Sequence, residues 1–142
     1  MSFEQVFATF GGNGNVWLEN EQWVVLIRAK QVTLGSSVLM LKRSALTIAD
    51  LSDQELLTFG AICRSMEARL KSAFAFDKIN YLMLAMKDPH LHFHVIPRYA
   101  SERQLFGVAW HDAGWPKPPN LETFVDTRHL VEQVLDVLRS TS

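Results

Sequence analysis

Short apolar stretches alternate with polar or glycine-containing segments along most of the chain, and this pattern predicts a sheet. Five stretches have the length and the β-branched or aromatic content of strands: Val16–Leu18, Trp23–Arg28, Ser37–Leu41, Lys78–Met86 and His90–Arg98. Only short polar segments separate the first two and the last two, so we expect each of these pairs to form a hairpin. The sheet is therefore expected to be mainly antiparallel.

Two other segments have the spacing of amphipathic helices. Ser52 and Glu55 form a capping-box pattern, and the helix that they begin is expected to run to about Ala73. Its inward stripe would consist of Leu56, Phe59, Cys63, Met66 and Leu70. Asp126 is expected to cap a final helix that ends at about Arg139. The inward residues of that helix would be Leu130, Val131, Val134, Leu135 and Leu138. Together these elements predict an α+β domain with the long helix packed on one face of the sheet.

The remaining segments have no clear periodicity. Residues 1–15 are left unassigned, except that Gly11–Asn15 contains enough glycine to be a loop. This loop lacks the Lys-Ser/Thr ending of a P-loop, so we do not expect it to bind phosphate. Ser101–Asn120 combines Trp110 and Trp115 with several Pro and Gly residues. We expect this segment to be irregular and to cover an edge of the core. No linker or repeat divides the sequence, and we expect a single domain over residues 1–142.

Composition narrows the classes of function. The 142 residues are 48% hydrophobic, which is enough for a buried core. The 14 basic and 15 acidic residues give a net charge of −1, which argues against a nucleic-acid-binding surface. The single Cys63 cannot form an internal disulfide, and no apolar run is long enough to cross a bilayer. Because the first residues also lack the basic start of a signal peptide, we expect a soluble cytoplasmic protein without a membrane partner.

The strand expected at His90–Arg98 carries the strongest chemical signal. Its successive side chains point to opposite faces. One face carries His90, His92 and His94, and the other carries Leu91, Phe93 and Val95. Three imidazoles would therefore stand in a row about 6.6 Å apart. A purely structural strand gains nothing from such a row, so we look for a chemical explanation.

Three interpretations of the histidine row differ in their chemistry. Buried core histidines are the structural one, although three of them at period two are unusual. A zinc site is the second, but rings at the two ends of the row lie about 13 Å apart, too far to share an ion with bonds of about 2 Å. Such a site needs further ligands, and Glu102 is the only acid in the ten residues after His94. The third is nucleophilic catalysis at phosphorus, for which neutral imidazole is suited near pH 7.

The stretch His90-Leu91-His92-Phe93-His94-Val95-Ile96, followed by Pro97-Arg98, resembles the histidine triad (HIT) motif, His-φ-His-φ-His-φ-φ with φ apolar, at every position. A looser resemblance extends from about Val16 to Pro119 and is strongest to the bacterial HIT proteins described as dinucleoside-polyphosphate-hydrolase-like. This resemblance implies a HIT-like fold and a homodimer in which two sheets join edge to edge. It also implies a hydrolase or transferase that acts at the α-phosphate of dinucleoside polyphosphates or nucleotide conjugates, without a metal or another cofactor.

The resemblance gives each histidine a role. His92 corresponds to the middle histidine, which attacks the α-phosphate and forms a nucleotidyl-histidine that water then hydrolyses. The backbone carbonyl of His90 corresponds to the group that holds the far nitrogen of the nucleophile. His94 corresponds to the third histidine, which donates to phosphate oxygens and stabilises the transition state. Two alternatives remain open, namely a sensor that binds nucleotides without turnover and a His-ligated metalloprotein.

The chain departs from the family pattern where a leaving group would be recognised. Leu34–Ser37 has no histidine where many members carry one, and Lys87–Pro89 replaces a longer loop that holds a Gln in several branches. Arg28 aligns with an Asn that some branches have near the end of the first long strand. Phosphate binding should draw on nearby cations, and Arg98 and Lys87 are the closest in sequence to the histidines. Arg28 is the third candidate for substrate binding.

Overall fold

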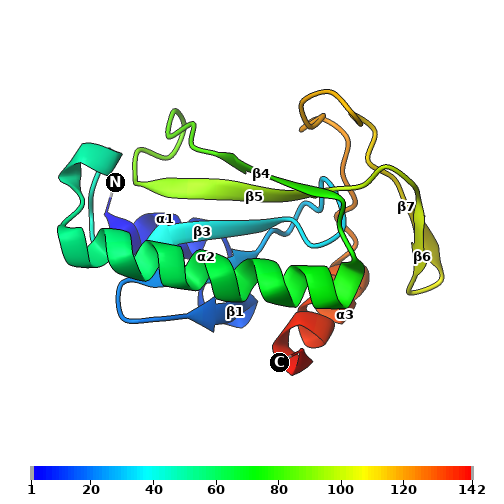
Figure 1. Cartoon of the computed structure of the whole chain (residues 1–142), viewed down its shortest axis with the longest axis horizontal. Coiled ribbons are helices and arrows are strands. Elements are labelled where there is room, and N and C mark those ends of the chain that lie inside the picture. Colours follow the sequence, from blue (N-terminus) through cyan, green and yellow to red (C-terminus); the bar gives the residue numbers. More distant parts are fainter. Residues whose placement is uncertain (1, 142) are drawn as a thin grey trace.

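The computed structural model, which describes residues 2–141, contains a five-stranded sheet with helices on both faces (Figure 1). Its strands are β1 (Val16–Glu19), β2 (Trp23–Ile27), β3 (Ser37–Leu41), β4 (Lys78–Leu82) and β5 (His92–Arg98). Their spatial order is β1-β2-β3-β5-β4, and every neighbouring pair is antiparallel. The predicted α+β fold with an antiparallel sheet is confirmed.

The connection between β4 and β5 is longer than the sequence predicts. β4 ends at Leu82 rather than at Met86, and β5 begins at His92 rather than at His90. Ala85 adopts a left-handed backbone conformation with φ 48°, which an extended strand cannot include. The two strands do pair, as expected, and Leu82 lies opposite His94 at the end of their ladder.

One face of the sheet is covered by α2 (Asp53–Phe74), which follows the short 3-10 helix η2 (Ile48–Asp50). The predicted capping box is present, because the Glu55 amide donates to the Ser52 hydroxyl and the Ser52 amide donates to the Glu55 carboxylate. Leu56, predicted to face inward, is 46% exposed instead. The stripe is rotated because Glu55 takes the buried position, where its carboxylate accepts from Arg43 at 2.7 Å. The buried apolar residues of this helix are Ile62, Met66, Leu70 and Phe74.

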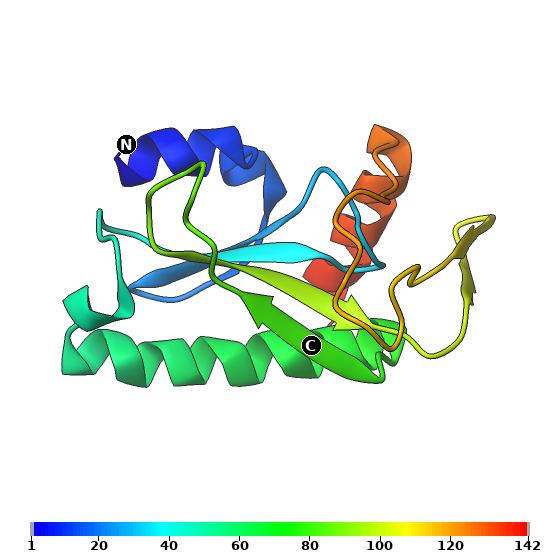
Figure 2. The same ribbon diagram turned by 90° about the horizontal axis from the view of Figure 1, so that it is seen from above.

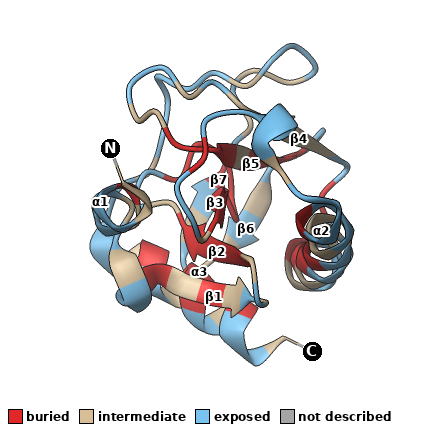
Figure 3. Cartoon of the chain, turned by 90° about the vertical axis from the view of Figure 1, so that its left-hand side faces the viewer, coloured by how far each residue is buried: buried red, intermediate tan, exposed pale blue. Residues whose placement is uncertain are grey.

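The opposite face is covered by a helix that we did not predict, α1 (Phe3–Thr9), which is followed by the 3-10 helix η1 (Gly12–Asn15). Figures 2 and 3 show α1 and α2 on opposite sides of the buried strands. Ser2 and Gln5 form a capping box that begins α1. Its buried Val6 packs in a small second core with Val24, Leu26, Val38 and Met40.

The C-terminal third contains a second unpredicted feature, the hairpin of β6 (Arg103–Leu105) and β7 (Val108–Trp110). Phe106 and Gly107 turn the chain with positive φ values of 57° and 75°, as a two-residue hairpin turn requires. The final helix, α3 (Arg128–Ser140), begins after Thr127. The expected cap at Asp126 is therefore wrong by one residue. The inward face contains the expected Val131, Val134, Leu135 and Leu138, with Leu130 half-buried beside them. Within residues 2–141, no helix is both long and apolar enough to span a membrane.

Candidate active site

The histidines of β5 lie on the face of the sheet that α1 covers, which we call the histidine face. Leu91, Phe93 and Val95 belong to the core on the α2 side, and Phe93 is only 8% exposed. The predicted division of this segment into an apolar side and a histidine side is confirmed. The predicted row of three is shorter, because His90 precedes β5 and only His92 and His94 are strand neighbours. Their ring centroids are 5.2 Å apart at an interplanar angle of 84°.

His92 is held in one tautomer by the backbone. Its Nδ1 lies 2.6 Å from the carbonyl oxygen of His90. A carbonyl oxygen only accepts, so Nδ1 must carry the proton, and the lone pair of the neutral ring is on Nε2. The ring is 3% exposed and lines a cavity. This geometry presents a basic nitrogen to whatever enters that cavity.

His90 is fully buried and is held by contacts with two other elements. Its Nε2 donates to the carbonyl oxygen of Leu41 at 2.7 Å, and its ring packs on Phe3 with centroids 5.7 Å apart. These contacts tie the segment before β5 to the end of β3 and to α1. Burial lowers the pKa of His90, opposed by its bond to the Leu41 carbonyl. A neutral His90 therefore fixes the carbonyl that orients His92.

His94 is half-buried and neutral near pH 7. Burial lowers the pKa of His94 to about 4, with further contributions from the charge of Arg28 and from His92. Its Nδ1 is buried and has no hydrogen-bond partner among residues 2–141. A neutral imidazole in this position can still donate one N–H to an oxygen in the cavity.

The cavity beside the two rings has a volume of about 210 Å³ and is lined on its other side by Leu84–Asp88, part of the β4–β5 connection. Leu84 is 52% and Met86 88% exposed, so the rim of the cavity is apolar. Phe10, just after α1, packs against both rings, with centroids 5.3 Å from His92 and 5.9 Å from His94. The histidines therefore lie between an aromatic wall and an apolar loop.

The three predicted cations occupy different environments. Lys87 lines the cavity and is exposed. Arg28 is half-buried at the end of β2 and lowers the pKa of His94. Arg98 is 4% exposed and fully engaged elsewhere. Its guanidinium bonds both carboxylate oxygens of Asp112 at 2.7 and 3.1 Å, and also Asn80 Oδ1 and the Lys117 carbonyl at 2.7 Å. The structure thus brings Lys87 and Arg28 towards the histidines but not Arg98.

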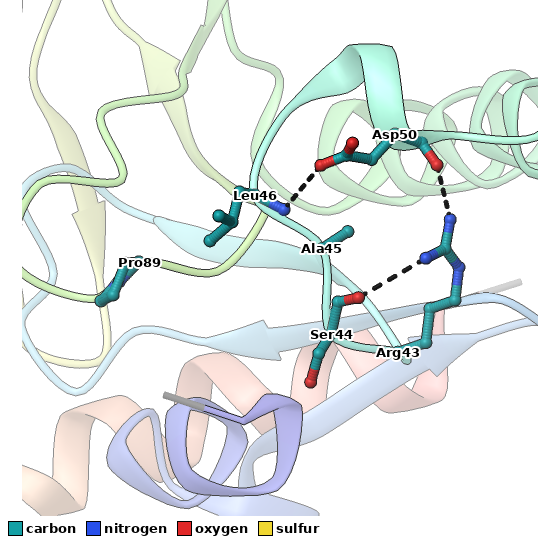
Figure 4. A pocket seen from close by; sticks show the side chains of 6 residues that line it. All are labelled: Arg43, Ser44, Ala45, Leu46, Asp50 and Pro89. Atoms are coloured by element: carbon teal, nitrogen blue, oxygen red, sulfur yellow. Dashed lines mark hydrogen bonds between the residues drawn. The ribbon is translucent and has the colours of Figure 1, made fainter.

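Among the larger cavities away from the histidine rings, two need a closer description. One, of about 390 Å³, is lined by Arg43, Ser44, Ala45, Leu46, Asp50 and Pro89 (Figure 4). Its charged groups are already paired, since Arg43 binds Glu55 and the Asp50 carboxylate accepts from the amides of residues 46 and 47. The other, of about 690 Å³, lies between β4 and Pro116–Pro119, beside Arg98. Within the described chain, no cluster of three or more His, Cys, Asp or Glu is arranged to hold a metal ion.

The sequence profile of the HIT domain matches residues 13–101, which is more than half of the chain. The chain belongs to the HIT domain family. A comparison with curated proteins gave no match. Solved HIT structures share the fold at low identity. A HIT protein from Sinorhizobium meliloti has a TM-score of 0.75 at 16% identity, covering 97% of this chain and 94% of that one.

Two other structural neighbours extend the comparison. A histidine triad protein from Bradyrhizobium japonicum has a TM-score of 0.68 at 20% identity and covers 90% of this chain and 91% of its own. A Plasmodium falciparum diadenosine triphosphate hydrolase, in complex with cyclomarin A, has a TM-score of 0.65 at 14% identity over 90% of this chain and 76% of that one. At these identities the likeness establishes the shared HIT fold.

The residue that sequence reasoning missed in this HIT site is Phe10. We left residues 1–15 unassigned, although Ser2 and Gln5 carry a capping-box pattern at helix spacing. Phe3 and Phe10 are seven residues apart, the spacing of one helix face, and both pack against histidines. The Gly-rich sequence after Phe10 hid this short helix.

Proposed function

We propose that this HIT protein is a nucleotide hydrolase or transferase that attacks the α-phosphate of its substrate with His92. One observation carries the proposal: the Nδ1 proton of His92 is bound by the His90 carbonyl, so Nε2 is the nucleophilic nitrogen beside the cavity.

The reaction would proceed in two displacements. The Nε2 lone pair of His92 forms a bond to the α-phosphorus, and the bond from phosphorus to the leaving group breaks. The leaving group departs with that electron pair and takes a proton from solvent. A water molecule then attacks the same phosphorus, releases a proton to solvent, and returns the electron pair of the P–N bond to His92. If another acceptor replaces water, the enzyme is a transferase.

The residues around His92 suit these two displacement steps. Neutral His94 is the donor for a phosphate oxygen, and His90 positions the nucleophile through its carbonyl. Lys87 remains a proposed substrate contact at the rim. The bonds that Arg98 makes to Asp112 and Asn80 leave it a positioning role, as the anchor of the segment after β7.

For the substrate we propose dinucleoside polyphosphates or related nucleotide conjugates such as phosphoramidates. A structural neighbour named as a diadenosine triphosphate hydrolase supports this class. We also propose that the protein acts in the cytoplasm as a homodimer. Binding without turnover would favour the sensor alternative.

The test is to trap the covalent intermediate. The protein is mixed with a panel of nucleotide conjugates, quenched without acid because phosphoramidate bonds are acid-sensitive, and analysed by peptide mass spectrometry. We expect a nucleotidyl group on His92 and none in His92→Asn. The control is His129→Asn, because His129 is exposed in the first turn of α3 and far in sequence from β5. A nucleotidyl group on another residue, or no adduct and no turnover with any conjugate, would contradict the proposal.

A further inference from the structure

Arg28 is unusual among the arginines of this protein. Four others contact a carboxylate: Arg43, Arg98, Arg103 and Arg128. The Arg28 guanidinium makes no hydrogen bond to any group of residues 2–141, and its Nη1 is completely buried. Burial lowers the pKa of Arg28, but a guanidinium remains protonated at any physiological pH. The histidine face therefore holds a fixed, half-buried positive charge that forms no ion pair with a carboxylate of residues 2–141.

The backbone places this charge close to the proposed nucleophile. The Arg28 amide donates to the Ser36 carbonyl at 2.9 Å, which extends the pairing of β2 with β3 by one step. Across the sheet, Leu26 pairs with Val38 and Val38 pairs with His94. Arg28 follows Leu26 by two residues and so shares its face. An arginine side chain is long enough to reach diagonally from this position towards the His94 ring.

An unpartnered, half-buried cation is costly, because the protein removes water from it and supplies no acceptor in return. Such a group is stabilised when an anionic ligand provides the missing acceptors. Phosphate suits it best, since the planar guanidinium fork matches two phosphate oxygens. The β4–β5 connection between Leu82 and His92 contains no Gln or Asn, so it offers no side-chain amide as an alternative donor.

We propose that Arg28 binds a nonbridging oxygen of the phosphate that His92 attacks, and that Arg28 and His94 together stabilise the charge that develops there. This inference rests on the proposed function, because it takes the attacked phosphate as the ligand. It adds a cationic phosphate contact that the histidines themselves do not provide. Burial keeps His94 neutral, and the charge of Arg28 adds to this effect, so a permanent cation lies beside a neutral imidazole.

The test compares ligands that differ only in the phosphate. Binding of AMP, adenosine and inorganic phosphate is measured by calorimetry for the wild type, Arg28→Met, Arg28→Lys and Lys30→Met. Lys30→Met is the matched control, because it removes the same charge two residues away, where the Lys30 ammonium lies over the Phe124 ring instead. Arg28→Met should bind AMP and inorganic phosphate about 10- to 100-fold more weakly, the effect of one lost charge-assisted bond. Its affinity for adenosine should not change, and Lys30→Met should behave as the wild type.

An equal loss of AMP and adenosine affinity in Arg28→Met, or no loss for either phosphate ligand, would overturn the inference. If Arg28→Met does not fold, the wild type still decides: inorganic phosphate should shift the NMR signal of the Arg28 Nε–H, and an unchanged signal at saturating phosphate contradicts the contact. These measurements involve no turnover. Full activity in His92→Asn would refute the proposed nucleophile, whereas an Arg28→Met variant with normal AMP binding would refute only the phosphate contact.

Discussion

The backbone and the surrounding residues give His92 and His94 different chemistry, although they are neighbours on one strand. His92 has a hydrogen-bond partner for Nδ1, the carbonyl of His90, whereas the Nδ1 of His94 is buried without one. Of these two histidines, only His92 has its tautomer and ring orientation fixed by a hydrogen bond within the protein. Two imidazoles whose environments differ in this way can take different parts in one reaction.

Replacing His92 with Asn should abolish the covalent route while preserving the fold. Asparagine keeps the polarity and approximate size of the side chain but removes the nucleophilic nitrogen, and the apolar side of β5 is unchanged. Steady-state turnover of any conjugate that forms the adduct should fall by several orders of magnitude. The circular dichroism spectrum and the affinity for AMP should stay close to those of the wild type. Activity within tenfold of the wild type would contradict the assignment of the nucleophile.

His94 should make the stability of the protein depend on pH. Its folded-state pKa is about 4, whereas an unfolded histidine titrates near pH 6.5. Between these values the unfolded chain binds one more proton than the folded chain, so stability should fall as the pH drops from about 6.5 to 4. The charged or titratable neighbours are Arg28 and His92, with Lys87 and Asp88 at the rim of the same cavity.

Urea unfolding between pH 7.5 and pH 4.5 should show this loss, and the slope should be shallower in His94→Gln. The pKa of His90 is also lowered, so part of the slope should remain in that variant. Identical slopes in His94→Gln and the wild type would mean that His94 has the same pKa in both states.

At the scale of elements, the apolar side of β5 is what holds the histidine face in register. Phe93 packs with Phe59 of α2 and Trp23 of β2, with centroids 5.2 and 6.5 Å apart. Phe93→Ala should lower the free energy of unfolding by about 3–5 kcal/mol, the usual cost of a large core deletion. The control Leu57→Ala, on the same helix as Phe59 but 70% exposed, should change it by less than about 0.5 kcal/mol. Similar values for the two variants would indicate a wrong strand register.

Removing one partner of the Arg98–Asp112 ion pair should lower the free energy of unfolding about as much as Phe93→Ala does. The side chains are 5% and 1% exposed, so removal of one partner leaves a buried charge. Asp112→Ala should cost about 3–5 kcal/mol in urea unfolding. Replacement of both residues, by Arg98→Met with Asp112→Leu, should restore part of that loss because no unpaired charge remains. A double variant that is less stable than Asp112→Ala would show that the guanidinium does more than balance the charge.

The strands and the two long helices could be predicted from the sequence because their patterns are repeated several times within each element. Ser37–Leu41 was predicted at its observed bounds, and α2 within one residue. The short elements have no such redundancy. α1 has seven residues and the strands of the β6–β7 hairpin have three each, and tertiary contacts rather than local propensity stabilise them.

Part of the site could be predicted because its histidines form a pattern that repeats within one segment. The alternation around His92 is local, whereas the partners of Arg98 come from Asp112 and Asn80, which are distant in sequence. The missing partner of Arg28 is a property of its surroundings in space. No spacing in the sequence indicates that a charge is buried or unpaired.

At the scale of the whole molecule, the two edges of the sheet differ in whether side chains bind their outer backbone carbonyls. Along β1 the carbonyls of Val16 and Trp17 accept hydrogen bonds from Arg139 and Arg69, and such charged cover blocks pairing with another strand. Within residues 2–141, no arginine is bound in this way along the outer edge of β4. The segment Pro116–Pro119 lies beside that edge and leaves the cavity of about 690 Å³ there.

We therefore expect the protein to form a homodimer through β4, as the family resemblance implies. Two β4 strands related by a twofold axis would pair antiparallel and continue the sheet from one subunit into the other. Sedimentation velocity at micromolar concentration should give the mass of a dimer, twice 16.2 kDa. Amide hydrogen exchange should then be slower in β4 at high protein concentration than on dilution. The β1 edge is the internal control, because its exchange should not depend on concentration. A monomer at micromolar concentration would remove the dimer but leave the chemistry of His92 unaffected, since both histidines and their cavity belong to a single chain.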